Sequence, residues 1–296
     1  MDSALVLNRV SKQYAGKAAV EDLSLTVPTG SVFALLGENS AGKTTTLKMI
    51  MGLTPPTSGQ ITLLGQDAWR EAAALRRRIG YVPEKPKFYD WMTVAEIGWF
   101  AAGFLPAGSL ERYQSWTRRF GLEESAKLRH LSKGHYSKVA LALALAGDPE
   151  VLVLDEPTSG LDLLVRREFL ESMVDLAGEG RTVIIASHQI AEVERIASHV
   201  AFLSQGRLLL SAPLDELRQR LVRITCRGGG PTPELAGLGH ILHKRSAAEQ
   251  WEAVVLDPNP TALESLQTTT EGDGMVLGPL SLEDAYTALL SRKEAA

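Results

Sequence analysis

The sequence predicts an α/β fold in which helices flank a mixed β-sheet. Short apolar runs, which are typical of buried strands, alternate with helix-like segments up to about residue 222. One such run, Ser31–Leu36, continues through a segment with two glycines, Gly37–Thr44, into the helix-like segment Lys43–Met51, and Gly52 ends it. This order of strand, glycine loop and helix is typical of a phosphate-binding unit.

The expected strands are the short apolar runs at Val32–Leu36, Ile61–Leu64, Ile79–Val82, Val151–Leu154, Thr182–Ala186, Val200–Leu203 and Leu208–Leu210. The expected helices are the longer segments at Lys43–Met51, Val94–Ala102, Leu110–Phe120, Ser137–Ala146, Leu164–Leu176 and Ile190–Ile196. Ser204–Arg207 lies between two apolar runs and indicates a hairpin turn.

Two interruptions of this alternation define the domain organisation. Residues from about 86 to 135 contain no convincing strand, which indicates an inserted helical subdomain. Gly228–Pro231 marks a second change, after which strand-like runs at Ile241–His243 and Trp251–Leu256 alternate with helix-like segments. The last helix starts at Ser281 with a pattern like a capping box. We therefore expect one domain over residues 1–222 and a small α+β appendage over residues 223–296.

Composition excludes several classes of protein. A formal net charge of −4 over 296 residues argues against a surface that coats nucleic acid, so no nucleic-acid partner is expected. Cys226 is the only cysteine, which excludes an intrachain disulfide and favours a reducing compartment. Met1–Arg9 has no features of a signal peptide. The most apolar stretch, Val139–Leu154, is broken by Asp148–Glu150, so a membrane role is expected to come through a partner.

The glycine segment carries the first part of the chemistry. Gly37 and Gly42 let the chain curl so that successive backbone N–H groups converge on an anion. The N-terminus of the following helix adds partial positive charge, Lys43 adds a full charge, and the hydroxyl of Thr44 can bind Mg²⁺. The segment therefore predicts a P-loop NTPase core that binds a nucleoside triphosphate.

Two adjacent acids carry the second part. The apolar run Val151–Leu154 ends in Asp155 and Glu156. A buried strand of this kind delivers both carboxylates to the edge of the sheet, where Asp155 can hold Mg²⁺ and Glu156 can polarise an attacking water. Two solvated acids at a strand end are the simpler interpretation, but the presence of the phosphate loop favours the catalytic one.

Further motifs follow in a fixed order: Leu131–His135, Asp155–Asp162 and Ile184–His188. Together with the phosphate loop, they resemble the signature loop, the Walker B strand with its D-loop, and the switch histidine of the nucleotide-binding subunit of ATP-binding cassette (ABC) transporters. The resemblance covers residues 4 to 222 and points to the exporter-like branch. It implies ATP and Mg²⁺ as cofactors and ATP hydrolysis as the activity.

The resemblance also implies a role for each matching residue. Lys43, Glu156 and His188 are the expected catalytic residues, and Thr44, Glu84 and Asp155 the expected magnesium ligands. The residues expected to contact ATP are Tyr14, which stacks on adenine in this family, Gly37, Glu38, Asn39, Ser40, Ala41, Gly42, Lys43, Thr44, Thr45, Ser132, Gly134 and Asp162. The other histidines, His130, His199, His240 and His243, show no ligand spacing and are expected to be structural.

Two positions depart from the family pattern. His135 stands where the signature loop commonly has glutamine, and we expect it to tune the loop, because the hydroxyl of Ser132 and the amide of Gly134 are both kept. Ser132 can equally serve as a plain helix N-cap. Glu84, within Tyr81–Glu84, stands where the family usually has glutamine, which favours export over import.

In the resembling family the signature loop of one subunit closes over ATP held by the P-loop of another. The resemblance therefore implies a homodimer, or a heterodimer with a second ABC ATPase. A separate transmembrane permease would complete the transporter, with the chain at the cytoplasmic face of the inner or plasma membrane. The alternatives are an importer ATPase, a soluble ABC ATPase acting on ribosomes or DNA, and a regulatory module that holds ATP without useful hydrolysis.

Aromatic residues gather in the expected helical subdomain, where the resembling family receives a short helix from its membrane subunit. Exposed aromatics suit such docking, but the same residues can also fill the core of the subdomain itself, and we expect most of them to do so. The residues concerned are Phe88, Tyr89, Trp91, Trp99, Phe100 and Phe104.

Overall fold

The computed structural model describes residues 2–227, 237–247, 250–269 and 275–295. The chain forms two compact units, Met1–Ser211 and Ala212–Ala296. The sequence placed the domain boundary between residues 222 and 223, about eleven residues later. Gly228–Pro231, which indicated the transition to the C-terminal appendage, lies outside the described residues.

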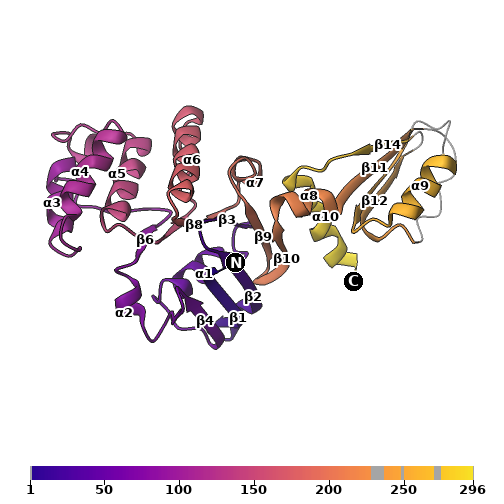
Figure 1. Ribbon diagram of the computed structural model, residues 1–296, viewed down its shortest axis with the longest axis horizontal. Helices are drawn as coiled ribbons and strands as arrows, with labels where there is room; N and C mark the ends of the chain where they lie inside the picture. The colour runs from indigo at the N-terminus through magenta and orange to yellow at the C-terminus, as the bar shows by residue number, and fades with distance from the viewer. Residues whose placement is uncertain (1, 228–236, 248–249, 270–274, 296) are drawn as a thin grey trace. The chain divides into compact units, whose positions relative to one another are not determined.

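A six-stranded sheet forms the centre of the first unit, with strand order β10-β9-β3-β8-β7-β6 (Figure 1). Its strands are β3 (Val32–Leu36), β6 (Ile79–Val82), β7 (Val151–Asp155), β8 (Thr182–Ser187), β9 (His199–Ser204) and β10 (Arg207–Pro213). Strands β9, β3, β8, β7 and β6 pair in parallel. Every residue of β3, β7 and β8 is buried, as expected for a parallel sheet covered on both faces.

The parallel arrangement brings distant motifs to one edge. The carboxyl ends of β3, β7 and β8 lead directly into Gly37, Glu156 and His188. Ligands of open α/β sheets bind at this edge. The predicted hairpin turn between β9 and β10 is confirmed, because Gln205 and Gly206 have left-handed φ angles of 49° and 78°, which two-residue hairpin turns require.

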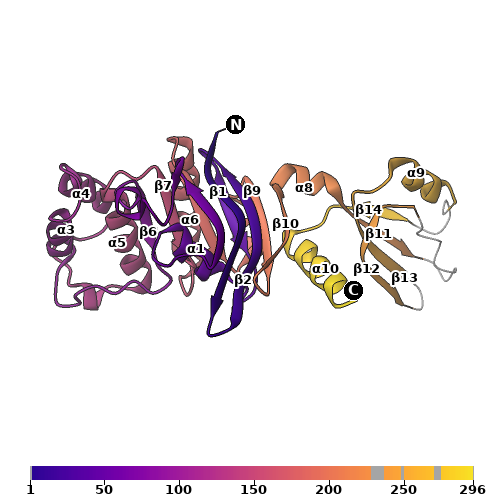
Figure 2. The same cartoon turned by 90° about the horizontal axis from the view of Figure 1, so that it is seen from below.

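A second sheet, ordered β2-β1-β4-β5, contains two long strands that we did not expect: β1 (Ser3–Tyr14) and β2 (Lys17–Pro28) (Figure 2). It is completed by β4 (Ser58–Leu63) and β5 (Gln66–Asp67). Register shifts interrupt the β1–β2 pairing, and Arg9 and Asp22 adopt left-handed φ angles of 48°. These irregularities interrupt the period-two hydrophobic pattern of both strands, but Leu23–Val27 of β2 keeps that pattern and was overlooked.

Apart from the short helix α2, which we did not expect, the helices of the first unit agree with the expected ones except at their ends. They are α1 (Lys43–Ile50), α2 (Ala72–Leu75), α5 (Lys133–Ala146), α6 (Leu163–Gly178) and α7 (Ile190–Val193). Helix α5 begins four residues earlier than expected, because the Ser132 side chain caps it. Helix α7 ends at Val193 rather than Ile196, because the chain tightens there and the Ile196 N–H donates to the Val193 carbonyl (3.1 Å).

The segment expected to be a helical subdomain contains α3 (Val94–Ala102), α4 (Ser109–Arg119) and the short 3₁₀ turn η1 (Leu128–His130), which lie beside α5. Thr93 and Glu96 form a capping box at the start of α3. The fully buried Tyr113 donates from its hydroxyl to the Val94 carbonyl (2.7 Å). These helices share a hydrophobic core of their own. The surface formed by Phe88–Phe104 therefore lies over a packed core.

The second unit is an α+β domain, as the sequence predicts. Its sheet has the order β12-β13-β11-β14, with all pairs antiparallel. The elements are α8 (Leu214–Arg220), β11 (Leu221–Arg227), β12 (His240–Ala247), β13 (Gln250–Leu256), α9 (Pro260–Thr269), β14 (Val276–Gly278) and α10 (Leu282–Ala295). Ile224, Trp251 and Leu266 belong to its buried core, and Ser281 caps α10 by accepting from the Asp284 N–H (3.1 Å).

Candidate nucleotide-binding site

The loop between β3 and α1 forms one wall of a polar cavity of about 510 Å³. Gly42 has a φ angle of 102°, and a Cβ atom at this position would lie 2.7 Å from the Ala19 carbonyl oxygen. A Cβ atom on Gly37 would collide with the Leu203 carbonyl oxygen. Only glycine therefore lets the loop curl this tightly against its neighbours. Asn39, Ser40, Ala41, Gly42, Lys43, Thr44 and Thr45 all line the cavity.

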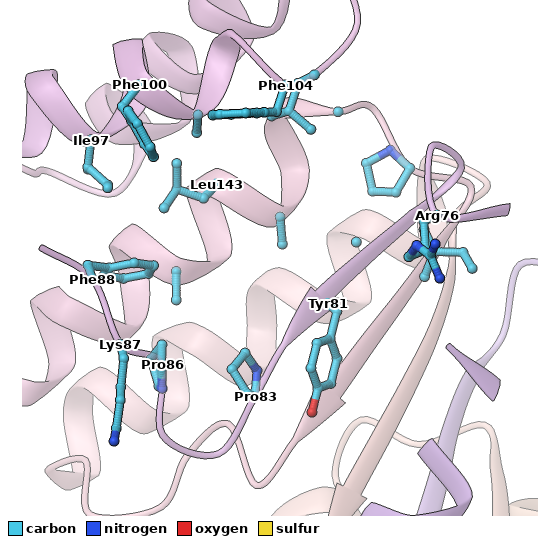
Figure 3. Close-up of a pocket in the computed structure, with 18 of the residues that line it drawn as sticks. Arg76, Tyr81, Pro83, Pro86, Lys87, Phe88, Ile97, Phe100, Phe104 and Leu143 are labelled. Atoms are coloured by element: carbon cyan, nitrogen blue, oxygen red, sulfur yellow. The ribbon is translucent and has the colours of Figure 1, made fainter. Parts of the chain in front are cut away.

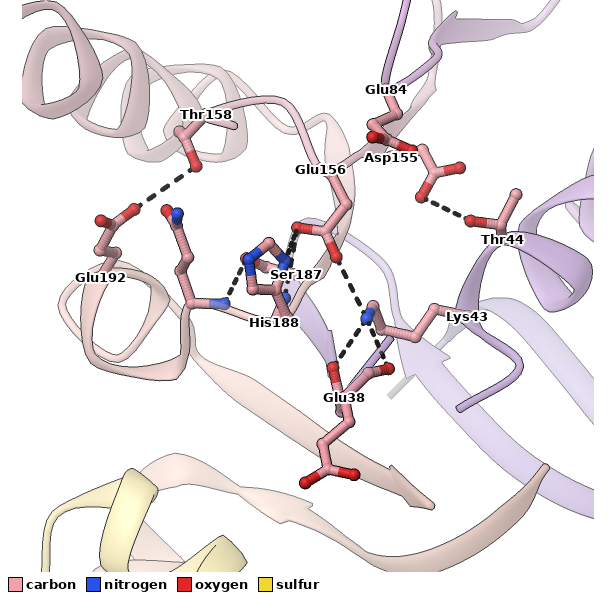
Figure 4. A network of polar contacts seen from close by, with 12 residues as sticks. Glu38, Lys43, Thr44, Glu84, Asp155, Glu156, Thr158, Ser187, His188 and Glu192 are labelled. Carbon is pink, nitrogen blue, oxygen red and sulfur yellow. Dashed lines mark hydrogen bonds and ion pairs between the residues drawn. The ribbon is translucent and has the colours of Figure 1, made fainter. Parts of the chain in front are cut away.

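Lys43 is buried at the base of this loop. Its ammonium group donates to the backbone carbonyls of Gly37 (2.7 Å) and Glu38 (3.2 Å), and it lies 3.1 Å from Oε1 of Glu156 (Figure 4). The side chains of Lys43 and Glu156 are only 6% and 9% exposed, so this ion pair is shielded from water. The ammonium group lies where it can meet a phosphate held by the loop.

Thr44 and Asp155 fit a magnesium site. The Thr44 hydroxyl donates to Oδ1 of Asp155 (3.1 Å), and Glu84 lines the same cavity. Burial raises the pKa of Asp155, and the nearby carboxylates of Glu156 and Glu84 raise it further, while Thr44 and Lys43 act in the opposite direction. A divalent cation would relieve this accumulation of negative charge. Within the described residues no cluster of three metal-ligating side chains exists, but Mg²⁺ commonly takes most of its ligands from phosphate and water.

Glu156 and His188 form the third part of the cavity. Oε2 of Glu156 lies 2.8 Å from Nδ1 of His188 and accepts from the His188 backbone N–H (3.3 Å). The Glu156 backbone has a left-handed φ angle of 48° and donates its N–H to the Ala186 carbonyl (2.9 Å). Such a conformation in a non-glycine residue costs on the order of 1 kcal/mol. The Glu156 carboxylate thus lies between the ammonium group of Lys43 and the imidazole ring of His188.

The other residues expected to contact ATP lie outside this cavity in the single chain. Ser132 caps α5, Gly134 is buried against Val165 of α6, and Asp162 caps α6 by accepting from the Val165 N–H (3.0 Å). Tyr14, at the end of β1, is 47% exposed, and the ammonium group of Lys12 lies 5.1 Å from its ring centre. The structure therefore brings the phosphate loop, the acids and His188 together, but leaves the signature loop apart from them.

Two residues that line the cavity were not expected. Ala19, from β2, faces the phosphate loop through its backbone, as the close approach to Gly42 shows. Ser159 lies in the segment that follows Glu156. Ser159 could have been found from its place within Asp155–Asp162, whereas no signal in the sequence marks Ala19.

The aromatic residues of the helical subdomain lie mostly on its surface. Trp91, Trp99 and Phe104 are 62%, 70% and 79% exposed, and Tyr89 and Phe100 are exposed as well. Phe88 alone of the six packs against the subdomain core. Filling of the core is therefore the wrong interpretation for the other five.

Tyr89, Phe100 and Phe104 contact one another in series and line a groove of about 750 Å³ between α3, α5 and the segment after β6 (Figure 3). Pro83, Pro86 and Phe88 form the part of its wall that follows β6, and Leu143 of α5 lies opposite. The groove is thus predominantly apolar and opens on the surface of the first unit.

Comparisons with known proteins agree with this geometry. The ABC transporter family model matches residues 20–159. The Nod factor export ATP-binding protein I of Burkholderia orbicola is 32% identical over 295 residues, which cover 96% of each chain. The chain belongs to the family of ABC transporter ATP-binding proteins.

Other relatives lead to the same family. An uncharacterised ABC transporter ATP-binding protein of Nostoc sp. is 40% identical over 206 residues, which cover 67% of this chain and 61% of that protein. The bacitracin transport ATP-binding protein BcrA of Bacillus licheniformis is 34% identical over 74% of this chain and 73% of its own length. A solved ATP-binding subunit of an ABC transporter has a TM-score of 0.66 at 32% identity and covers 73% of this chain and 92% of that one.

These relatives show that this chain contains an ABC-type ATPase domain with a P-loop NTPase fold, which we call the cassette. The match spans only 61% and 58% of the length of two of the cyanobacterial relatives. In the part of the chain that the structure describes, we find no helix with the length and apolar character needed to cross a membrane.

Proposed function

We propose that this chain binds and hydrolyses ATP as the ATPase subunit of an export-type ABC transporter. The observation that carries the proposal is the meeting of Lys43, Glu156 and His188 within one cavity at the carboxyl edge of the sheet. Relatives named for Nod factor export and bacitracin transport support the export assignment.

Each residue of the cavity has a chemical task in this proposal. The loop amides and the ammonium group of Lys43 bind the phosphates, and Lys43 stabilises the charge that develops on the transferred phosphoryl group. Thr44 and Asp155 would hold Mg²⁺ with Glu84 nearby. When bound, the cation supplies charge neutralisation at the phosphate oxygens. Glu156 takes a proton from the attacking water, and His188 orients the Glu156 carboxylate by the contact at Nδ1.

The arrangement also suggests that an active site needs two copies of the cassette. Ser132, Gly134 and Asp162 are absent from the lining of the cavity that contains Lys43. A second copy of this chain, or a related ATPase, would supply these residues from its own α5 and α6 and cover the nucleotide. The hydroxyl of Ser132 and the N-terminus of α5 are suited to an anion such as the terminal phosphate.

The aromatic groove provides the surface for a membrane partner. An amphipathic helix of a transmembrane permease would place its apolar side chains between Phe100, Phe104 and Leu143. Tyr81 lines the same groove, and its pKa is raised to about 12 by burial and by the charge of Asp155. This docking would hold the chain at the cytoplasmic face of the membrane.

Substitution of Glu156 by glutamine tests the proposal. E156Q keeps the size of the side chain but replaces one acceptor oxygen by an amide NH2 and removes the base, so we expect ATP binding to persist while turnover falls by roughly 100-fold or more. Without hydrolysis, ATP should also accumulate an associated form of the variant. The measurements are ATP affinity by calorimetry, phosphate release and sedimentation. Wild-type turnover in E156Q would remove Glu156 from its role.

A further inference from the structure

Ser132 and His135 form a polar pair at the start of α5. Oγ of Ser132 accepts a hydrogen bond from the His135 backbone N–H (3.2 Å), and the same oxygen lies 3.1 Å from Nδ1 of the His135 ring. Both side chains are exposed, whereas Gly134 between them is buried against Val165 of α6. The Ser132 and His135 side chains therefore lie on the surface, and the backbone that connects them packs against α6 through Gly134.

The position of one proton decides what Ser132 presents to its surroundings. A hydroxyl group has one proton and two acceptor positions, and the His135 backbone N–H occupies one acceptor position. If Nδ1 of His135 carries no proton, the hydroxyl donates to Nδ1 and turns a lone pair outward. If Nδ1 carries a proton, it donates to Oγ, and the hydroxyl proton is free to point outward.

We propose that His135 is a positioning residue whose protonated form turns Ser132 into a hydrogen-bond donor toward the terminal phosphate of ATP held by a second copy of the cassette. The inference rests on the proposed function, because it assigns Ser132 to the nucleotide of the partner. An outward lone pair repels a phosphate oxygen, whereas an outward O–H binds it, and the imidazolium adds a positive charge.

Histidine is the side chain whose charge ordinarily changes between about pH 5 and pH 8. In the proposed pair the neutral His135 ring keeps its one proton on Nε2, so Nδ1 accepts from Ser132. Closure of the shared site over ATP should therefore be weaker with the neutral ring than with the charged one. A glutamine at the same position carries amide N–H groups at any of these pH values. H135Q should thus remove the pH dependence while keeping a donor beside Ser132.

The charged groups around the start of α5 come from η1, α5 and α6. Arg129 donates from Nε to His130 (2.9 Å), Lys138 pairs with Glu168 (3.0 Å), and Arg166 pairs with Glu192 of α7. Lys133 extends over Gly160. None of these contacts involves the His135 ring, so H135Q leaves them in place. A pH effect that disappears with H135Q alone is therefore assigned to that ring.

The test compares E156Q with the double variant E156Q/H135Q. The ATP concentration for half-maximal association is measured by sedimentation at about pH 6 and about pH 8, which bracket the titration of histidine. We expect E156Q to need at least about 3-fold more ATP at the higher pH, and the double variant about the same concentration at both. E156Q/H130Q, which replaces a nearby exposed histidine, should behave as E156Q does. An equal pH ratio in E156Q and E156Q/H135Q would overturn the inference.

A second measurement needs no association. Nitrogen NMR of the histidine rings in the nucleotide-free chain at about pH 8 should show Nδ1 of His135 as the unprotonated acceptor, and S132A should shift its resonance. An unchanged resonance in S132A would refute the Ser132–His135 contact by itself. If E156Q fails to associate with ATP at either pH, the proposed function fails, and the NMR result still judges the contact separately.

Discussion

Asp155 shows how a binding residue can oppose the stability of its own domain. Its carboxyl group is 2% exposed, and burial raises its pKa above the ordinary value. The charged form is therefore disfavoured in the folded chain. The free energy of unfolding therefore falls as the pH rises from the ordinary aspartate pKa through the raised one, and this loss persists at higher pH.

D155N should remove this cost and the magnesium ligand together. We expect the thermal midpoint of the nucleotide-free protein near neutral pH to rise by roughly 2–4 °C, as about 1 kcal/mol would produce in a domain of this size, while magnesium-dependent turnover is lost. The gain should shrink at acid pH, where Asp155 of the wild type takes up its proton. Calorimetry checks this, with D215N at an exposed position as the control. A lower midpoint for D155N at neutral pH would contradict the account.

Sequence reasoning reached most single residues of the site because each motif is local. Gly37–Thr44 builds its cradle from consecutive backbone amides, and Asp155 and Glu156 follow one strand, so spacing along the chain determines their positions. Ala19 could not be found in this way, since its backbone meets the phosphate loop only through the pairing of β2. That contact depends on tertiary structure and leaves no local pattern.

At the level of elements, the central strands and most helices were predictable, whereas β1 and β2 were not. The buried strands of the parallel sheet are continuous apolar runs, which composition alone marks. The bulged β1–β2 ribbon changes face at each irregularity, which hides its alternation in the sequence except at Leu23–Val27 of β2, where the signal was overlooked. The exposure of the aromatics in Tyr89–Phe104 was predicted wrongly, because a hydrophobic residue fits either a core or a docking surface and the core was the interpretation favoured from the sequence.

The aromatic groove gives a prediction for the segment that follows α3. Phe104 is 79% exposed and lines the groove, so F104D should place a charge where an apolar helix would dock. We expect co-purification with a co-expressed permease from detergent to fall at least about 10-fold, with ATP affinity of the variant unchanged. L53D is the matched control, because Leu53 is an exposed leucine of the first unit outside the groove lining. Equal recovery of the permease with F104D and L53D would exclude the groove as its docking surface.

In the whole molecule, the distance between two site residues along the sequence does not predict whether they meet in space. Lys43, Glu156 and His188 lie far apart in the sequence, yet the parallel sheet collects them in one cavity. Ser132 lies between Lys43 and Glu156 in the sequence but remains outside that cavity. The fold of a single chain therefore accounts for one part of the proposed site, and in the proposed function a second copy or a related ATPase supplies the rest.

A crosslink between two copies tests this central claim most directly. One copy of E156Q carries N39C in the phosphate loop, the other carries S132C, and both carry C226A so that no native thiol remains. After the two are mixed with a short thiol crosslinker, we predict a product of twice the chain mass that forms with ATP and not without it, whereas L53C in place of N39C yields none. Crosslinking of N39C to S132C that is no greater with saturating ATP than without it would contradict the account.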